Sequence, residues 1–305
     1  MELREFAPNT WSHRGVSAMW LRAFQIARAG TNVEPGLAQI TDLEDVRLVL
    51  GRGELTYVAA DQKWTLDATD SLRLQVHLSE QTTPEMTFLL LLTPWESEHP
   101  NPELLAHDRL ESSAGLVAAV LGENAVYARV FENKIGLNEV RTEGVGPVVR
   151  VPSASTPRLD GSALEELRLL DAAIASQDAS ARERGRLSLR WFRAATLDSG
   201  VDAFLKYWIA LETLAMPDTT DIREIKRLLA SAYSSPSGTD PFQIGRLFGL
   251  RSRIVHDGLR MGITAAVESY LRAIYTDLLS AAVGRPCPHR AAAAQADGQV
   301  VIDGC

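Results

Sequence analysis

The chain contains little cysteine: only Cys287 and Cys305 occur among its 305 residues, and both lie near the C-terminal end. Two cysteines in one terminal segment cannot form the disulfide framework of a small secreted protein. Cys287 and His289 have a spacing at which a metal site can begin, but no second pair of ligands follows at a suitable distance. The sequence therefore predicts a solvated tail in this region, with no metal site and no cofactor.

Long apolar runs are also lacking. The longest, TFLLLLTPW at residues 87–95, is far too short to span a bilayer, and the N-terminal MELREFAPNTW lacks the charged and then apolar pattern of a signal peptide. Positive charge is not in excess, because 31 lysines and arginines face 39 acidic residues and leave a net charge of −8. These absences predict a cytoplasmic protein without membrane contact, and they restrict any binding of nucleic acid to a local site.

What is present is the composition of a globular protein, 46% hydrophobic and 23% charged, at a length that favours two domains. In the first half, short aliphatic or β-branched segments separated by turn-forming residues predict a sheet. These segments are residues 46–50, 54–60, 72–78 and 86–93, with further strand character at 124–132 and 145–151. A helix is predicted over 102–122, which has a proline near its start and a glycine at its end.

The segment VPSASTPRLDG at residues 151–161 breaks this pattern and predicts a domain boundary. Beyond it, the strand signal ends and periodic apolar positions predict an antiparallel helical bundle. The expected helices cover about 162–177, 180–197, 200–215, 220–234, 240–257 and 263–284. The predicted fold class is therefore α+β: a mixed α/β domain of residues 1–155, an all-α domain of residues 156–285, and a flexible tail of residues 286–305.

One arginine lies on the apolar face of the helix predicted around residues 244–256. On a helical wheel this face consists of Ile244, Leu247, Phe248, Ile254 and Val255. Arg251 falls near its centre, whereas Arg246 and Arg253 fall on the opposite side, where basic side chains normally meet water. A guanidinium cannot be neutralised, so burying Arg251 demands a carboxylate partner, or a cleft or interface in which it meets an anion.

Two interpretations of Arg251 follow. In the structural one, it pairs with Glu212, which flanks the apolar face of FLKYWIALETLA, and His256 is a simple residue at the helix end. In the functional one, Arg251 and His256 edge a site, with Ser252 on the same flank as His256. Asp257 and Gly258 would stop the helix and place His256 in its last turn, where the carbonyl ends favour a protonated imidazole.

The residues R251-S-R-I-V-H256, followed by Asp-Gly, resemble the Arg-x4-His signature of HEPN domains, and more specifically of the ApeA-like HEPN branch found in bacterial defence proteins. Upstream, residues 187–215 resemble the paired helices of that branch, with Trp208 and Glu212 in a W-x3-E pattern. The resemblance covers roughly residues 180–285, about a third of the chain. Ser252 departs from the pattern, because many members of the family carry a planar polar group after the arginine.

The resemblance implies a metal-independent endoribonuclease that dimerises so that two Arg-x4-His motifs face one cleft. It implies that His256 is the acid or base, that Arg251 holds phosphate oxygens, and that Glu212, Ser252 and Asp257 support them. The residue types suit this chemistry, because histidine titrates near neutral pH and a guanidinium fits phosphate. RNA would then be cleaved through its 2′-hydroxyl to a 2′,3′-cyclic phosphate. The implied setting is antiviral defence or a toxin system, with the N-terminal domain as sensor or as the contact for a partner protein.

Other interpretations remain open. A non-catalytic HEPN-like module that dimerises or binds a nucleotide or protein would keep Arg251 and His256 for structure. The basic segment 181–193 could contact RNA through Arg186 and Arg190, together with Arg253 on the later helix, although its Trp191 and Phe192 are expected to pack inward. A nuclease site in the N-terminal domain could use the carboxylates of Asp42, Glu44 and Asp45, which are more typical of a turn.

Overall fold

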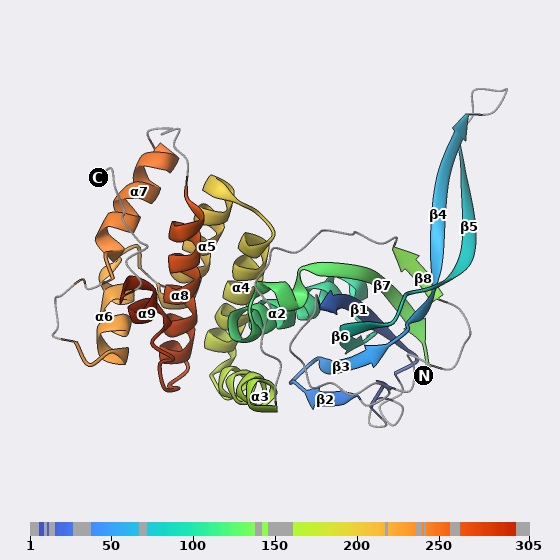
Figure 1. Ribbon diagram of the computed structural model, residues 1–305, viewed down its shortest axis with the longest axis horizontal. Coiled ribbons are helices and arrows are strands. Elements are labelled where there is room, and N and C mark those ends of the chain that lie inside the picture. Colours follow the sequence, from blue (N-terminus) through green and yellow to red (C-terminus); the bar gives the residue numbers. More distant parts are fainter. Residues whose placement is uncertain are drawn as a thin grey trace. The chain divides into compact units, whose positions relative to one another are not determined.

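The computed structural model describes residues 6–8, 11, 16–26, 38–66, 72–137, 142–145, 161–216, 219–235, 240, 242–256 and 263–296. The chain forms two compact units, one of Met1–Ser113 with Leu121–Leu164 and one of Ala114–Val120 with Glu165–Cys305. Strands lie in the first unit and most helices in the second, so the fold is of the mixed α+β kind (Figure 1). The boundary predicted near residue 155 lies outside the described residues.

The first unit contains a six-stranded sheet in the order β2-β3-β6-β1-β7-β8, in which every neighbouring pair is antiparallel (Figure 1). Its strands are β1 (Ala18–Ile26), β2 (Gln39–Asp42), β3 (Arg47–Gly53), β6 (Met86–Pro94), β7 (Ala128–Gly136) and β8 (Thr142–Val145). Strands β4 (Thr56–Leu66) and β5 (Leu72–Thr82) form a separate hairpin. The strands predicted at 46–50, 54–60, 72–78 and 86–93 are confirmed, whereas β1 was not predicted.

Alternation along the central strands divides their side chains between two faces of the sheet. One face of β1 contributes Met19, Leu21 and Ala23 to a hydrophobic core that also includes Phe131 and Ile135 of β7. The opposite face of the same strand carries Trp20 and Arg22. Helix α2 (Pro102–Leu121) places Glu111 within hydrogen-bonding distance of Arg22, so this second face is partly charged.

Gly115 in α2 permits a close approach within the second unit. A Cβ atom at this position would lie 2.2 Å from the carbonyl oxygen of Leu189. Leu189 belongs to α4, so this glycine lets the backbones of two helices meet. After α2, the 3-10 helix η2 (Glu123–Val126) leads into β7.

The six helices expected from the sequence beyond the predicted boundary are all present. They are α3 (Gly161–Ala175), α4 (Ala179–Thr196), α5 (Gly200–Ala215), α6 (Arg223–Ala232), α7 (Ile244–His256) and α8 (Ala265–Ala282). Phe192 of α4 stacks on Tyr275 of α8 at 4.3 Å between ring centroids, and it meets Tyr207 of α5 edge to face. Aromatic packing therefore joins α4, α5 and α8, and no helix in the described residues is both long and apolar enough to cross a membrane.

Part of the segment predicted to be a flexible tail forms helix α9 (Arg290–Ala296). The buried carboxylate of Asp277 on α8 accepts hydrogen bonds from the backbone N–H groups of Arg290 and Ala291 and from the hydroxyl of Tyr233. Burial, and then the hydrogen bond to Asp277, raise the pKa of the Tyr233 phenol far above its ordinary value, so it remains a donor. Asp277, a residue of another helix, thus caps α9, and no local sequence pattern indicates this contact. The rest of the predicted tail, residues 297–305, lies outside the described residues.

Candidate functional site

Helix α7, which carries the Arg-x4-His motif, is held mainly at its N-terminal end. The Asp240 carboxylate accepts hydrogen bonds from the backbone N–H groups of Ile244 and Gly245, both at 2.8 Å, and pairs with Lys226 of α6. Tyr270 of α8 donates a hydrogen bond to the backbone carbonyl of Phe242. These contacts satisfy free N–H groups of the first turn and fix where the helix starts.

Burial of the apolar stripe on α7 ends at Arg251. Ile244, Leu247 and Leu250 are buried, but Ile254 is half-buried and Val255 is 48% exposed. The predicted apolar face is therefore wrong in its second half, and it omitted Leu250. The reason is tertiary: in the described residues, the other helices cover the N-terminal half of the stripe and leave its C-terminal half open.

Arg251 pairs with Glu212 of α5, as the structural interpretation predicted. Its Nη2 atom lies 3.8 Å from Oε1 of Glu212, and the two side chains retain 26% and 27% of their exposure. Glu212 is held from the other side by Trp208, whose Nε1 donates a hydrogen bond to the same oxygen at 2.6 Å. Trp208 in turn contacts Phe248 of α7 at 6.0 Å between ring centroids. Arg251 is thus paired loosely and is still open to a ligand.

Arg251 and Glu212 line a pocket of about 510 Å³. The other lining residues are Arg184, Thr213, Met216, Thr219, Thr220 and Phe248. Two guanidinium groups and three threonine hydroxyls outweigh the single carboxylate, so the lining favours an anion such as phosphate. Arg184 was not among the residues predicted to contact RNA, which on the same helix were Arg186 and Arg190. The only signal for it in the sequence was its place in the arginine-rich segment 181–193; the structure shows that it lies one helical turn before the buried Ser188.

His256 is the last residue of α7, is exposed, and does not line this pocket. It follows Arg251 by five residues, which corresponds to a rotation of roughly 140° around the helix. Ser252 is half-buried, and Asp257 and Gly258, to which the helix stop was assigned, lie outside the described residues. Within one chain, Arg251 and His256 therefore extend in different directions.

The basic segment of α4 is only partly at the surface. Arg186, Arg190 and Trp191 are half-buried, and so is Arg253 on α7. Phe192 is buried, as the inward-packing interpretation predicted, and the buried Arg193 donates a hydrogen bond to the hydroxyl of Thr196. A continuous basic surface along all five arginines of residues 181–193 is therefore absent from the described helix.

The alternative acidic cluster forms the turn between β2 and β3. Asp42 accepts two hydrogen bonds from Arg47, and Asp45 pairs with Arg109 at 3.8 Å. The backbone N–H of Leu43 bonds to the carbonyl of Val46, and this closes the turn around Glu44. The acidic cluster therefore has the ion pairs and hydrogen bonds of a structural turn.

Cys287 and His289 lie beside α9. The His289 ring meets Tyr233 edge to face at 4.7 Å, and burial raises the pKa of the Cys287 thiol. Both residues therefore take part in the contacts around the capped start of α9.

Comparison with protein-family models, with curated proteins and with solved structures finds no match to this chain.

Proposed function

We propose that this protein is a metal-independent endoribonuclease of the HEPN type, with Arg251 and His256 as its catalytic residues. The observation that carries the proposal is the state of Arg251: it lies in a pocket with a second arginine and is held by a loose, partly exposed ion pair. The lining of this pocket, with two guanidinium groups and three threonine hydroxyls around one carboxylate, suits a phosphate group.

The chemistry requires only groups that these residues supply. The 2′-hydroxyl of RNA attacks the adjacent phosphorus, and His256 accepts the hydroxyl proton. Arg251 stabilises the negative charge that develops on the non-bridging phosphate oxygens, while Arg184 binds a neighbouring phosphate. The departing 5′-oxygen takes a proton from a histidine, and the products are a 2′,3′-cyclic phosphate and a 5′-hydroxyl.

A homodimer would bring the two kinds of catalytic group together. Arg251 and His256 of one chain extend in different directions, so a single chain does not present both to one phosphate. Two α7 helices related by a twofold axis would set the arginine of one chain near the histidine of the other. The exposed Val255 and half-buried Ile254, next to His256, would be covered in such a dimer.

The setting we propose is that of an effector in bacterial antiviral defence or in a toxin system, acting in the cytoplasm, with the first unit as sensor or partner contact. Alternatively, the second unit is a non-catalytic dimerisation or binding module. The exposed position of His256, away from the pocket of Arg251, is the observation that favours this alternative.

RNA cleavage by the purified chain in EDTA tests the proposal. We expect products with 2′,3′-cyclic phosphate ends, a loss of about 10²- to 10⁴-fold in rate for His256→Ala, and about 10²-fold or more for Arg251→Ala. Arg246→Ala is the matched control, because Arg246 is exposed on the opposite side of the same helix. No cleavage by a folded dimer, or cleavage that both catalytic variants retain, would contradict the proposal.

The dimer is tested separately by sedimentation of the Val255→Glu variant. A charge at this exposed position should leave the fold of the monomer intact, shift the chain to monomer and reduce cleavage. If the variant remains a dimer and cleaves normally, the proposed interface along α7 is wrong.

A further inference from the structure

The first unit has a pocket of its own, of about 730 Å³, beside the face of the sheet that carries Trp20. This volume lies within the range of small-molecule sites, roughly 300–1,000 Å³. The lining residues are Trp20, Trp95, Pro100, Asn101, Pro102, Glu103, Leu104, His107, Arg129 and Glu132. None of them contributes to the chemistry proposed for the second unit.

The walls of this pocket are aromatic and apolar. Trp20 and Trp95 stack with ring centroids 5.4 Å apart and an angle of 16° between their planes. The Trp20 indole is fixed in orientation, because its Nε1 donates a 2.6 Å hydrogen bond to Glu132. Leu104 lies at the start of α2, is 58% exposed and adds an apolar side chain to the lining. A planar, partly apolar ligand suits such walls.

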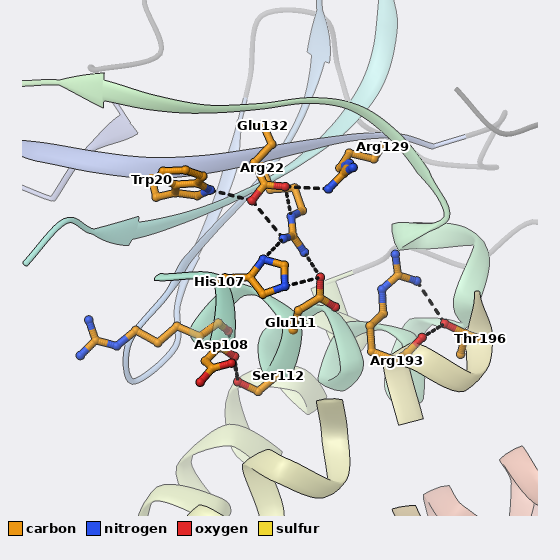
Figure 2. A network of polar contacts seen from close by, with 11 residues as sticks. Trp20, Arg22, His107, Asp108, Glu111, Ser112, Arg129, Glu132, Arg193 and Thr196 are labelled. Carbon is orange, nitrogen blue, oxygen red and sulfur yellow. Dashed lines mark hydrogen bonds and ion pairs between the residues drawn. The ribbon is translucent and has the colours of Figure 1, made fainter. Parts of the chain in front are cut away.

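A buried arginine organises the polar side of the pocket. Arg22 is only 1% exposed, and Figure 2 shows it between Glu132 on one side and His107 and Glu111 on the other. It donates hydrogen bonds to Glu132 from Nε and Nη2, and to Glu111 from Nη1. Removing one partner of such a buried network is strongly destabilising, so the network holds the side chains that line the pocket in fixed orientations.

The network determines which groups remain available to a ligand. Each carboxylate oxygen of Glu132 already accepts two hydrogen bonds, Oε1 from Trp20 and Arg22, and Oε2 from Arg22 and Arg129. Nδ1 of His107 lies 3.1 Å from Nη2 of Arg22, which is always a donor, so Nδ1 is the acceptor and the ring proton lies on Nε2. Nε2 of His107 faces Oε1 of Glu111 at 3.9 Å, which is too long for a hydrogen bond, so its N–H group can still turn to a ligand, whereas Glu132 offers no further acceptor.

Arg129 supplies the second donor. One of its nitrogens bonds to Glu132 at 2.8 Å, but the side chain remains 31% exposed and has further N–H groups. Lys134, whose ammonium lies 4.4 Å from the centre of the Trp95 ring, adds positive charge nearby. Glu103 and Asn101, at the start of α2, add acceptors to the lining.

We propose that this pocket binds a nucleotide. The base lies against the tryptophan and proline walls, its amino and ring groups meet Glu103 and Asn101, and its phosphate is bound by Arg129 and the Nε2–H of His107. Nucleotides combine a planar heteroaromatic ring that bears donors with an anionic group, which is the combination this lining accommodates. The proposal is independent of ribonuclease activity in the second unit.

Calorimetric titration of the full chain with adenosine monophosphate, adenosine and inorganic phosphate tests the proposal. We expect the monophosphate to bind, adenosine to bind at least about tenfold more weakly because it lacks the charge-assisted hydrogen bonds, and phosphate alone to bind most weakly. Equal binding of the monophosphate and adenosine would overturn the assignment of the phosphate to Arg129 and His107. No heat of binding from either at millimolar concentration would overturn the site itself.

Three variants locate the binding. Trp95→Ala should weaken the binding of both the monophosphate and adenosine, whereas Arg129→Gln should weaken the binding of the monophosphate only. Each loss of affinity should be about tenfold or more. Leu104→Glu places a negative charge at an exposed position that tolerates substitution, so it should weaken the binding of the monophosphate. It provides a test if either of the other two variants fails to fold. Arg251→Ala is the control for the pocket of the second unit. Binding that is lost in Arg251→Ala but retained in the other three variants would place the nucleotide elsewhere and overturn the proposal.

Discussion

Arg251 on α7 and Glu212 on α5 form an ion pair of 3.8 Å in which both side chains keep about a quarter of their exposure, 26% and 27%. A pair of this length and exposure stabilises a fold by less than about 1 kcal/mol. Glu212 is itself held by Trp208, so we expect the pair to orient Arg251 rather than to stabilise the fold.

Glu212→Gln should therefore separate orientation from stability. Glutamine keeps an acceptor for Trp208 but removes the charge that faces Arg251, so we expect a change in unfolding free energy below about 1 kcal/mol and a roughly tenfold loss of RNA cleavage. Denaturant unfolding and initial cleavage rates measure the two effects. Asp198→Asn, which removes the partner of Lys206 in the same unit, is the control and should alter neither. A large loss of stability with normal cleavage would mean that the pair serves the fold alone.

The stability of the first unit should fall in acid through Glu132. Burial by itself raises the pKa of this carboxyl, but the charge of Arg22, together with hydrogen bonds from Arg22 and Trp20, outweighs burial and holds the pKa below its ordinary value. A lowered folded-state pKa gives stability that is present above the unfolded pKa of about 4.3 and is lost as the pH falls through the folded value.

The measurement is the free energy of unfolding at a series of pH values from 7 to 3, with tryptophan fluorescence as the signal that reports unfolding. Glu132→Gln should lower stability at pH 7 and show a shallower decline below about pH 4.3, because the titrating group is gone. If the variant and the native chain decline in parallel, Glu132 is not the group that links stability to pH.

Removing the Asp277 carboxylate should release α9. Asp277→Ala leaves two backbone N–H groups and the Tyr233 hydroxyl without their acceptor, so we expect a loss of about 2–3 kcal/mol. Hydrogen exchange of the amides in residues 290–296 should become faster. Asp178→Ala is the comparison, because Asp178 caps α4 at an exposed position; it should cost about 1 kcal/mol and leave exchange in α9 unchanged.

Replacing Gly115 by alanine and replacing Gly249 by alanine should change the stability of the chain in opposite directions. Gly115→Ala should destabilise the chain by about 1–3 kcal/mol, because the new Cβ would lie 2.2 Å from the carbonyl oxygen of Leu189. Gly249→Ala should stabilise it by roughly 0.5–1 kcal/mol, because nothing lies within 4 Å of that Cβ. Thermal unfolding of both variants checks the pair. A stabilising Gly115→Ala would show that the two helices can separate at little cost.

Strand β1 shows why part of the fold could not be predicted from the sequence. Its segment AMWLRAFQI contains an arginine between apolar residues, and the burial of Arg22 is compensated by Glu111 and Glu132, which lie 89 and 110 residues later in the chain. Arg184 was missed for a similar reason. Local periodicity places it at the edge of a packed face, but only the approach of α5 and α7 makes it part of a pocket.

By itself, the sequence predicted the six periodic helices between residues 161 and 282 and four of the strands, and it offered Glu212 as the partner of Arg251 in one of two interpretations. These features depend on spacing within one element and on the cost of burying a charge alone. Tertiary structure decided where burial of α7 stops, which carboxylates compensate Arg22, and which residue caps α9. These depend on groups that are distant in the chain and meet only after folding, so no pattern within a single helix or strand contains them.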